Sequence, residues 1–488
     1  MSATQVITRF APSPTGFMHV GGVRTAIFAY LWAKRNNGKF ILRIEDTDKE
    51  REVDGSIEHI IESLQWLGVS WDEGPIVGGQ HAPYIQSQRL DIYKKYASIL
   101  IERGYAYPDP YTTEEIESFR KKAEEEKKPF LYREYRPEIF DSWDGTKPLR
   151  FRIPEIKTTT WNDVVFGNLS AGPEALDDFI LIKSDGYPTY NFAHIVDDIE
   201  MGVTLVCRGQ EFISSTPKFL SVYQALNITP PSFASLPHIM AEGGNKKLGK
   251  RDGAKDILEY RDEGYLPEAL FNFLTFLGWN PGTNDEILSK EELVTIFDIS
   301  KIQKAGAQFN DEKLDWLNRE YLKKYSKEEL VSYFSKGIPE EIKSSTACTP
   351  LLIEKLAPVL LERISKNSDL DKMYKEGELL YFFQQPIDYA ISNIIWKTGT
   401  KEETVTHLNT VSEILSTAPE DIFDTPDKIK NLLWEYAEKF GRGNVLWPLR
   451  YTLSGKEKSP DPFTLVYILG KEESISRIIY AKNLLQAI

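Results

Sequence analysis

The sequence contains little cysteine and no long apolar segment. It has 488 residues and only two cysteines, Cys207 and Cys348, which excludes a disulfide framework and a zinc site built of cysteines alone. No run approaches about 18 apolar residues without a charge, and residues 1–10 lack the apolar core of a signal peptide. The sequence therefore predicts a cytoplasmic location and no membrane partner.

Two common nucleotide-binding motifs are also missing. The sequence has no GxxxxGK followed by serine or threonine, and no GxGxxG follows a predicted strand. A P-loop and a dinucleotide-binding turn therefore lose their main support. Any nucleotide must be held in another way.

Basic residues are fewer than acidic ones. The chain has 59 Lys and Arg against 73 Asp and Glu, which gives a net charge of −14. Taken alone, this balance argues against a protein that coats nucleic acid indiscriminately, because counterion release needs Lys and Arg facing phosphates. It does not exclude a basic face on an acidic body.

The overall composition is that of a folded protein with several domains. Hydrophobic residues make up 41% and charged residues 27% of the chain, which is ordinary for globular proteins and excludes a disordered chain. The length favours about three domains.

Strand and helix patterns alternate at the start of the chain. Residues 6–10 and 40–44 are predicted strands, and residues 23–35 form a predicted helix between them that stops before Gly38. The next helix has Ile and Leu at spacings of three and four and ends at Gly68. This order predicts a βαβ unit and a parallel sheet.

A segment with a different pattern interrupts the alternation from about Tyr84. It contains a possible capping box, residues 112–115, and three short β-like runs between residues 149 and 182. We predict an insertion with a small sheet of its own. A strand and a helix between residues 203 and 226 then resume the alternation, so the main sheet is completed after the insertion.

Strand signals stop beyond about residue 325. Ser326 and Glu329 form a capping-box pair, and amphipathic stretches continue to the C-terminus, which predicts an all-helical region. Its predicted breaks lie near Pro350, Asn367, Gly399, Pro426 and Gly455.

Two short motifs are candidates for nucleotide chemistry. A turn rich in Pro and Gly leads into His19-Val20-Gly21-Gly22 at the mouth of the first helix, where a neutral donor, two glycines and a positive helix end suit phosphate and adenine. A basic cluster, Lys246–Arg251, lies in a later predicted loop. Each motif alone is more often a helix-start histidine or a solvated charge run. The two motifs together are stronger evidence for nucleotide chemistry than either motif alone.

These motifs resemble the two signatures of the class I aminoacyl-tRNA synthetases, named HIGH and KMSKS. His19–Gly22 (HVGG) is similar to the first and Lys247–Arg251 (KLGKR) to the second. Other segments resemble the bacterial glutamyl-tRNA synthetases, and the resemblance covers nearly the whole chain. These segments are TRFAPSPTG (8–16), RIEDTD (43–48), SDGYPTYNFAHIVDD (184–198), MGVTLVCRGQE (201–211), RYTLSG (450–455) and ILGKEE (468–473).

The resemblance implies an α/β fold, in which a Rossmann-like parallel-sheet catalytic domain is split by an α+β insertion and followed by an all-α C-terminal anticodon-binding region. The two halves of the catalytic domain are predicted at 1–83 and 187–242. The insertion, 84–186, would bind the tRNA acceptor end. A stem-contact region with the KMSKS-like loop is predicted at 243–325, and the helical anticodon-binding domain at 326–488.

The implied activity is ATP-dependent ligation of L-glutamate to the 3′ end of tRNA(Glu) through glutamyl-adenylate, with release of AMP and pyrophosphate. The implied partners are L-glutamate, ATP with Mg²⁺, and tRNA(Glu), and the implied state is a monomer. Whether tRNA(Gln) is also charged stays open. Some relatives carry zinc in the insertion, but Tyr105–Pro108 has no Cys or His, so no zinc and no protein zinc ligands are expected.

The resemblance also implies roles for single residues. For catalysis, His19 would hydrogen-bond the triphosphate, and Lys250, assisted by Lys247, would hold the β- and γ-phosphates. For glutamate, Arg9 would pair with the γ-carboxylate, while Glu45 would take the α-amino group. The other predicted glutamate residues are Ala11, Ser13, Tyr190, His194 and Arg208, and the other predicted ATP residues are Thr15, Gly21, Gly22, Glu211 and Leu248.

Some assignments stay open at this point. His194 is as well explained by a structural role as by substrate binding. Gly249 stands where the family usually has serine, and Gln210 replaces a common acid. The alternatives are a glutaminyl-tRNA synthetase, which a β-barrel C-terminus would favour, and a non-catalytic tRNA-binding paralogue.

Overall fold

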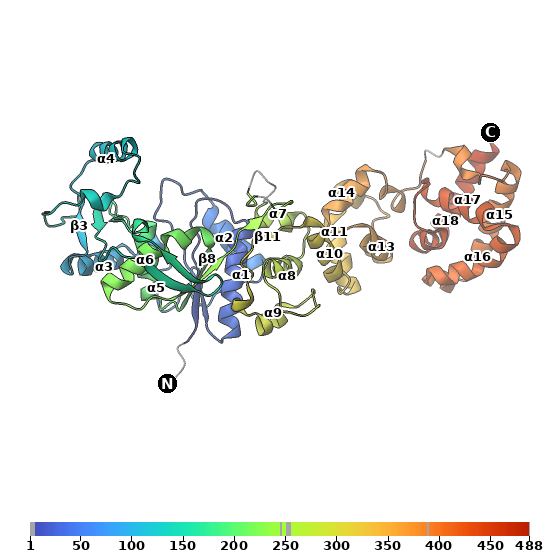
Figure 1. The fold of residues 1–488 in the computed structure, drawn as a ribbon. Coiled ribbons are helices and arrows are strands. Elements are labelled where there is room, and N and C mark those ends of the chain that lie inside the picture. Colours follow the sequence, from blue (N-terminus) through green and yellow to red (C-terminus); the bar gives the residue numbers. More distant parts are fainter. Residues whose placement is uncertain (1–4, 245, 250–254, 388–389, 488) are drawn as a thin grey trace. The chain divides into compact units, whose positions relative to one another are not determined.

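The computed structural model describes residues 5–244, 246–249, 255–387 and 390–487 (Figure 1). The chain forms two compact units. The N-terminal unit is Met1–Asp262 with Leu266–Leu314, and the C-terminal unit is Glu263–Tyr265 with Asp315–Ile488. The units divide inside helix α10 (Asp311–Leu322), so most of the predicted stem-contact region belongs to the N-terminal unit.

The N-terminal unit is built on a six-stranded sheet. Strands β2, β1, β8, β9 and β5 run parallel, and β6 closes the edge antiparallel to β5. The predicted parallel α/β sheet is therefore confirmed. In sheet order the strands are β2 (Lys39–Leu42), β1 (Ile7–Phe10), β8 (Leu205–Gly209), β9 (Ser232–Leu236), β5 (Thr159–Asp163) and β6 (Gly167–Ala171).

Helix α1 (Val20–Arg35) connects β1 to β2 and packs on β1 and β8. Its buried residues include Val23, Ile27 and Leu31, which recur every four residues and form one apolar stripe. The return to β2 passes Gly38, where an added Cβ would lie 2.1 Å from the Val6 carbonyl oxygen. Only glycine permits this close approach.

The insertion contributes to two sheets, which corrects the sequence prediction. Strands β3 (Ala106–Pro108), β4 (Leu149–Phe151) and β7 (Ile180–Ile182) form a separate antiparallel sheet, as expected. The hairpin β5–β6 instead joins the main sheet next to β9. Asp163 fastens it there, because its buried carboxylate accepts the backbone N–H of Ser235 at 3.0 Å.

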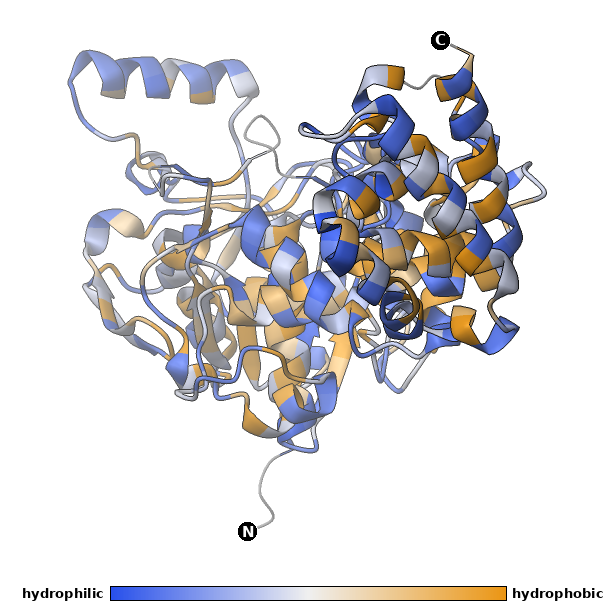
Figure 2. Cartoon of the chain, turned by 90° about the vertical axis from the view of Figure 1, so that its right-hand side faces the viewer, coloured by the Kyte–Doolittle hydropathy of each residue, from blue (hydrophilic) through white to orange (hydrophobic). Residues whose placement is uncertain are grey.

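The remaining elements of this unit are mostly helices. The capping box of Thr112 and Glu115 is confirmed at the start of α4 (Thr113–Glu125), a helix that is mainly hydrophilic with a few hydrophobic positions (Figure 2). Short strands β10 (Ile239–Met240) and β11 (Ala307–Gln308) pair in parallel. The other helices are α2 (Ser56–Trp66), α3 (Leu90–Glu102), α5 (Tyr190–Glu200), α6 (Thr216–Leu226), α7 (Ile257–Asp262), α8 (Pro267–Phe276) and α9 (Lys290–Ile296).

The C-terminal unit is helical, and its described residues contain no strand. The predicted breaks coincide with helix ends: Pro350 and Pro426 are first helical residues, and Gly455 is a C-cap. None of the described helices is long and apolar enough to cross a membrane. The helices are α11 (Lys327–Gly337), α12 (Glu340–Lys343), α13 (Pro350–Arg363), α14 (Ser368–Lys375), α15 (Lys401–Thr417), α16 (Pro426–Phe440), α17 (Arg442–Ser454) and α18 (Pro462–Gln486).

Candidate active site

A cavity of about 300 Å³ opens where β1, β8 and β9 end, beside the first turn of α1. The carboxyl ends of parallel strands meet at one edge of a sheet, which is where open α/β folds bind ligands. Most residues predicted for the site line this cavity. They are Arg9, Ala11, Ser13, His19, Gly21, Gly22, Glu45, Tyr190, Arg208, Glu211 and Lys247.

One side of the cavity is formed by the start of α1. His19 is the N-cap, and its Nδ1 accepts the backbone N–H of Gly21 at 3.1 Å. A Cβ on Gly21 would lie 2.9 Å from His19 Cε1, so a larger residue here would displace the His19 side chain. The positive end of the helix faces the cavity, which suits an anion.

The KMSKS-like segment begins beside the same helix end. Lys247 pairs with Met240 of β10 as an isolated antiparallel bridge, and its Nζ lies 3.9 Å from Oε1 of Glu211. Lys250, predicted as the main phosphate-binding lysine, lies outside the described residues.

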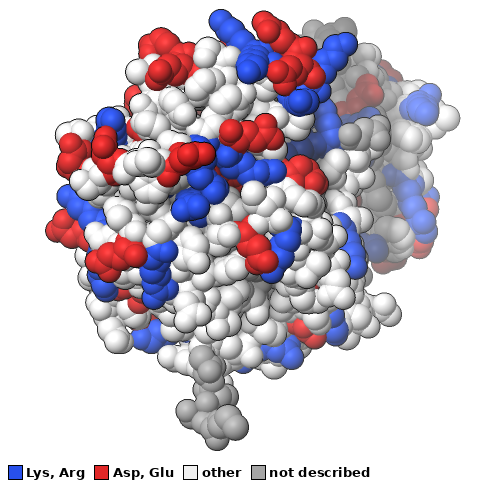
Figure 3. Space-filling model, turned by 60° about the vertical axis from the view of Figure 1, so that its left-hand side comes forward, with Lys and Arg blue, Asp and Glu red and all other residues white. Residues whose placement is uncertain are grey.

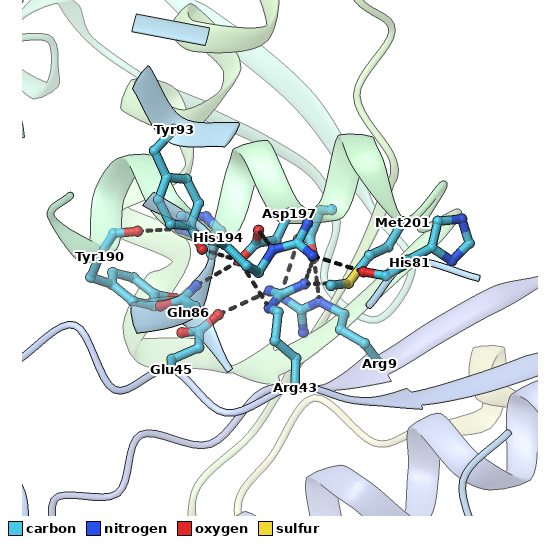
Figure 4. Close-up of polar contacts among 12 residues, drawn as sticks. Arg9, Arg43, Glu45, His81, Gln86, Tyr93, Tyr190, His194, Asp197 and Met201 are labelled. Carbon is cyan, nitrogen blue, oxygen red and sulfur yellow. Dashed lines mark hydrogen bonds and ion pairs between the residues drawn. The ribbon is translucent and has the colours of Figure 1, made fainter. Parts of the chain in front are cut away.

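The other side of the cavity rests on a buried network of charges (Figure 4). Arg9 donates from Nε to Asp198 Oδ1 at 3.0 Å and from Nη1 to the Cys207 carbonyl at 3.3 Å. Arg43 donates to the same Asp198 oxygen at 2.8 Å and to Glu45 Oε1 at 2.9 Å. All four charged side chains are buried, so their positions are fixed by one another.

Burial and neighbouring charges oppose each other in this network. Burial alone would raise the pKa of Asp198, but Arg9 and Arg43 outweigh it and hold that pKa at about 2. Burial does raise the pKa of Glu45 above its ordinary value, against the opposing effect of Arg43. Asp198 is therefore a permanent anion that neutralises part of the arginine charge.

Arg208 and Arg9 are both 5% exposed, but they differ in their hydrogen-bond partners. Its Nη2 donates to the Thr216 hydroxyl at 2.6 Å, whereas Nε and Nη1 have no hydrogen-bond partner among the residues that the structure describes. Its guanidinium lies 4.9 Å from the ring centre of Phe219 and 4.8 Å from that of Phe233. Burial lowers its pKa. Such a cation is costly unless an anion joins it.

Tyr190 and His194 lie on consecutive turns of α5 but have different places. Tyr190 lines the cavity. His194 lies behind it: the two rings stack with centres 4.6 Å apart, and the His194 Nδ1 bonds the Tyr190 carbonyl at 2.6 Å. Burial lowers the pKa of His194 to about 3. A neutral, structural histidine is thus the better description of His194.

Two other predicted ATP residues do not line the cavity. Thr15 is exposed, and Leu248 is held through its backbone N–H, which donates to the Ile239 carbonyl at 2.8 Å. Sequence reasoning also missed residues that do line it, Arg24 and His238. Arg24 follows Gly21 by three residues on α1, so helical spacing could have found it. His238 follows β9 in a loop, and no sequence signal marks it.

Arg24 connects α1 to the other segments of the cavity wall. Its guanidinium donates to the carbonyls of Leu277, at 3.0 Å, and of Pro237. Burial lowers its pKa to about 10, and Glu211 partly offsets this. Arg24 therefore adds positive charge below the helix end.

Asp197 joins the insertion to α5 below the cavity (Figure 4). It accepts hydrogen bonds from Arg89 Nε at 2.7 Å, Gln86 Nε2 at 2.8 Å and the Tyr93 hydroxyl at 2.9 Å. The neighbouring residue, Asp198, holds Arg9. Arg43 pairs with both of these successive carboxylates, at 3.5 Å from Asp197 and 2.8 Å from Asp198. Across the described part of the chain, no group of three or more His, Cys, Asp or Glu is placed to hold a metal ion.

The chain matches two protein-family models. Residues 5–316 match the class I tRNA synthetases for E and Q, catalytic domain, and residues 312–482 match an anticodon binding domain. A glutamate–tRNA ligase of Clostridium acetobutylicum is 40% identical over 493 residues, which cover 98% of both chains. The chain belongs to the glutamate–tRNA ligase family. The family resemblance of the sequence motifs is thereby confirmed.

Other members of the family are similar to this chain over nearly its full length. The glutamate–tRNA ligase of Clostridium kluyveri is 40% identical and covers 98% of this chain and 97% of its own. A crystal structure of a glutamate tRNA ligase from Elizabethkingia meningosepticum, in complex with its amino acid, has a TM-score of 0.88 at 37% identity and covers 99% of this chain and 100% of its own. The fold and the activity class of the family therefore apply to the whole chain.

Proposed function

We propose that this chain ligates L-glutamate to the 3′ end of tRNA(Glu) in two steps. The glutamate α-carboxylate attacks the α-phosphorus of ATP, a carboxylate–phosphorus bond forms, and pyrophosphate leaves. The terminal ribose hydroxyl of tRNA then takes the glutamyl group, and AMP leaves. The observation that carries the proposal is the cavity that has, at one side, a buried arginine without an acidic partner among the described residues and, at the other, a helix N-terminus.

Arg208 supports the assignment of an acidic amino acid. A buried guanidinium without an acidic partner among the described residues is stabilised by a substrate carboxylate, through short charge-assisted bonds. Arg9 is proposed for the γ-carboxylate, with Asp198 fixing its orientation. Glutamine would leave donors opposite its amide, which costs several kcal/mol, or about a thousandfold in discrimination.

Glu45 and Tyr190 are proposed to orient the same substrate. Glu45, held by Arg43, accepts from the α-ammonium group, and Tyr190 donates to the carboxylate end. Ala11 and Ser13 line the wall between them. Fixing both ends of glutamate orients its α-carboxylate for attack, and such orientation, together with charge stabilisation, is how a protein promotes transfer at phosphorus.

The helix end is proposed to receive ATP. His19 and the backbone donors of Gly21 and Gly22 would contact the phosphates, and Lys247 would stabilise the charge on departing pyrophosphate. Mg²⁺ would arrive bound to the ATP phosphates. Lys250 stays a prediction of the sequence motif, as do the absence of zinc, the monomeric state and the cytoplasmic location.

The proposed regions for tRNA are the insertion, residues 84–186, for the acceptor end, residues 243–325 for the stem, and residues 326–488 for the anticodon. The C-terminal unit has cations stacked on aromatic rings: Arg450 lies 4.7 Å from the Trp447 ring centre and Arg442 lies 4.5 Å from that of Trp434. Such surfaces suit unstacked bases of a loop.

Surface charge supports selective binding of tRNA. Figure 3 shows positive and negative side chains intermingled on the face that it draws, without a broad area of one sign. Indiscriminate binding would need a continuous basic surface.

Aminoacylation with purified components tests the proposal. Glutamate and glutamine are each supplied with ATP and with purified tRNA(Glu) or tRNA(Gln). We expect glutamate on tRNA(Glu) and no product with glutamine. Charging of tRNA(Gln) with glutamate would show that the protein does not discriminate between the two tRNAs. Preference for glutamine would overturn the substrate assignment, and tRNA binding without ATP turnover would favour the non-catalytic paralogue.

A further inference from the structure

His59, near the start of α2, contacts the segment that leads into α1. The backbone N–H of Met18 donates to His59 Nδ1 at 3.3 Å, and the Phe17 ring stacks on the imidazole with centres 4.5 Å apart and planes at 15°. The His59 side chain is 11% exposed. No residue of α2, all of which the structure describes, lines the cavity.

The opposite side of the same ring contacts the residues that follow the KMSKS-like segment. His59 Nε2 lies 3.2 Å from Oδ1 of Asp256. Asp256 forms an antiparallel bridge with His19, and the next residue, Ile257, donates its N–H to the Met18 carbonyl at 2.9 Å. His59 and Asp256 therefore contact each other, and both contact residues 17–19, which directly precede the first helical residue of α1.

The two bonds of His59 require one protonation form. Nδ1 accepts from a backbone N–H, so it carries no proton, and Nε2–H then donates to the Asp256 carboxylate. The neutral Nε2–H tautomer satisfies both partners at once. Ser63 supports it, because its hydroxyl lies 3.3 Å from Nδ1. Neither alanine nor phenylalanine could make either bond.

We propose that His59 is a positioning residue that connects Phe17 and Met18, just before the first signature, to Asp256, which follows the second, and so sets the orientation of His19 toward ATP. The inference rests on the proposed function, in which both segments contact the nucleotide. His59 acts without touching substrate. It fixes the entry to α1 on one side and the chain after the second signature on the other. A displacement of a catalytic group by about 1 Å lowers turnover by up to about a hundredfold.

The structure offers a matched control. Arg261 and Glu62 also connect α7 to α2, through Nη1 and Oε1 at 2.5 Å, but neither residue has a described contact with residues 17–19. Glu62→Gln therefore removes one α2–α7 contact without changing the support of His19. Two conservative variants test the two His59 contacts separately. His59→Asn can keep a hydrogen-bond acceptor near the position of Nδ1, and His59→Gln can keep a hydrogen-bond donor near the position of Nε2.

The experiment measures tRNA-dependent glutamate charging and melting temperature for wild type, His59→Ala, His59→Asn, His59→Gln and Glu62→Gln. We expect His59→Ala to lower kcat/KM for ATP by about tenfold or more, with KM for glutamate within about twofold of wild type. His59→Asn and His59→Gln should each recover part of the loss. Glu62→Gln should stay within about twofold of wild type in both constants.

Other results would overturn the inference. Unchanged ATP kinetics in His59→Ala would do so, as would equal losses of kcat/KM for ATP in His59→Ala and Glu62→Gln. A loss of the same size in the kinetics for ATP and for glutamate, in proportion to a fall in melting temperature, would also overturn it. If wild type does not charge glutamate, the proposed function fails. ATP binding by titration calorimetry then decides the inference separately: His59→Ala should bind ATP about tenfold more weakly than Glu62→Gln, and equal affinities would refute it.

Discussion

At the scale of single residues, two of the three buried arginines that line the cavity, Arg9 and Arg208, have different surroundings. Arg9 is neutralised by Asp198, whereas Arg208 has aromatic rings and one hydroxyl around it. The first arginine belongs to a paired network, and the second remains a charge without a counter-ion among the described residues. Removing one partner of a buried pair lowers the stability of the folded protein because the other charge is left buried, and a buried cation without a counter-ion lowers it until an anion binds.

This contrast predicts that replacing arginine by glutamine has different effects on stability at positions 9 and 208. Arg9→Gln leaves Asp198 with Arg43 alone, and we expect it to lower the free energy of unfolding by about 3 kcal/mol. Arg208→Gln removes an unpaired charge and should leave stability unchanged or higher. Urea unfolding of both variants without substrate checks this. The same Arg208→Gln variant should raise KM for glutamate by about a hundredfold. Equal destabilisation by both substitutions would contradict the difference in pairing.

His194 predicts a loss of stability in mild acid. Burial lowers its pKa from an ordinary 6.5 to about 3, so between these values the unfolded chain binds a proton that the folded one does not. Stability therefore falls as pH drops below 6.5, by roughly 2 kcal/mol at pH 5. Urea unfolding at pH 7.5 and 5 should show this loss, and His194→Asn should lose clearly less. An equal loss in both proteins would assign the acid sensitivity to other groups.

At the scale of elements, Asp163 decides to which sheet the β5–β6 hairpin belongs. Its Oδ1 accepts the backbone N–H groups of Val165 and Phe166, both at 2.9 Å, and Oδ2 accepts that of Ser235. One buried carboxylate thus closes the hairpin and connects it to β9. The hydrophobic pattern of residues 149–182 contains no sign of this partner, because a strand pattern specifies a face and not a neighbour.

Removing that carboxylate should cost more than removing its exposed neighbour. Asp163→Ala leaves three backbone donors unpaired, and we expect a loss of about 3 kcal/mol in the free energy of unfolding. Asn162→Ala, which removes an exposed amide bonded to Asn168, should cost less than about 1 kcal/mol. Denaturant unfolding of the two variants makes the comparison. Similar small losses would mean that β5 is held by its strand pairing alone.

At the scale of the whole molecule, the charge of −14 and the binding of tRNA are compatible. Intermingled charges allow local contacts between cations and phosphates without a basic surface everywhere (Figure 3). The family membership makes tRNA the partner, so net charge limits unspecific binding and does not exclude nucleic acid.

Salt should therefore weaken tRNA binding selectively. Contacts with phosphates release counterions, so we expect the affinity for tRNA to fall at least about tenfold between about 50 and 200 mM salt. KM for glutamate depends on short-range bonds inside a cavity and should change less than about threefold. Filter binding and charging kinetics over this salt range measure both. A tRNA affinity independent of salt would contradict binding through phosphate contacts.

The sequence by itself determined the parallel sheet, the helical C-terminal region and about half of the residues that line the cavity. Helix spacing, caps and the two signatures are local patterns, and Ser326 with Glu329 or the HVGG motif can be read from neighbouring residues. Only the tertiary structure decided that Asp198 neutralises Arg9, while Arg208 has no acidic partner in the described part of the chain. It also decided that His194 lies behind Tyr190 and that His59 contacts Asp256. These contacts join residues far apart in the chain, and burial and pairing depend on which of them the fold brings together.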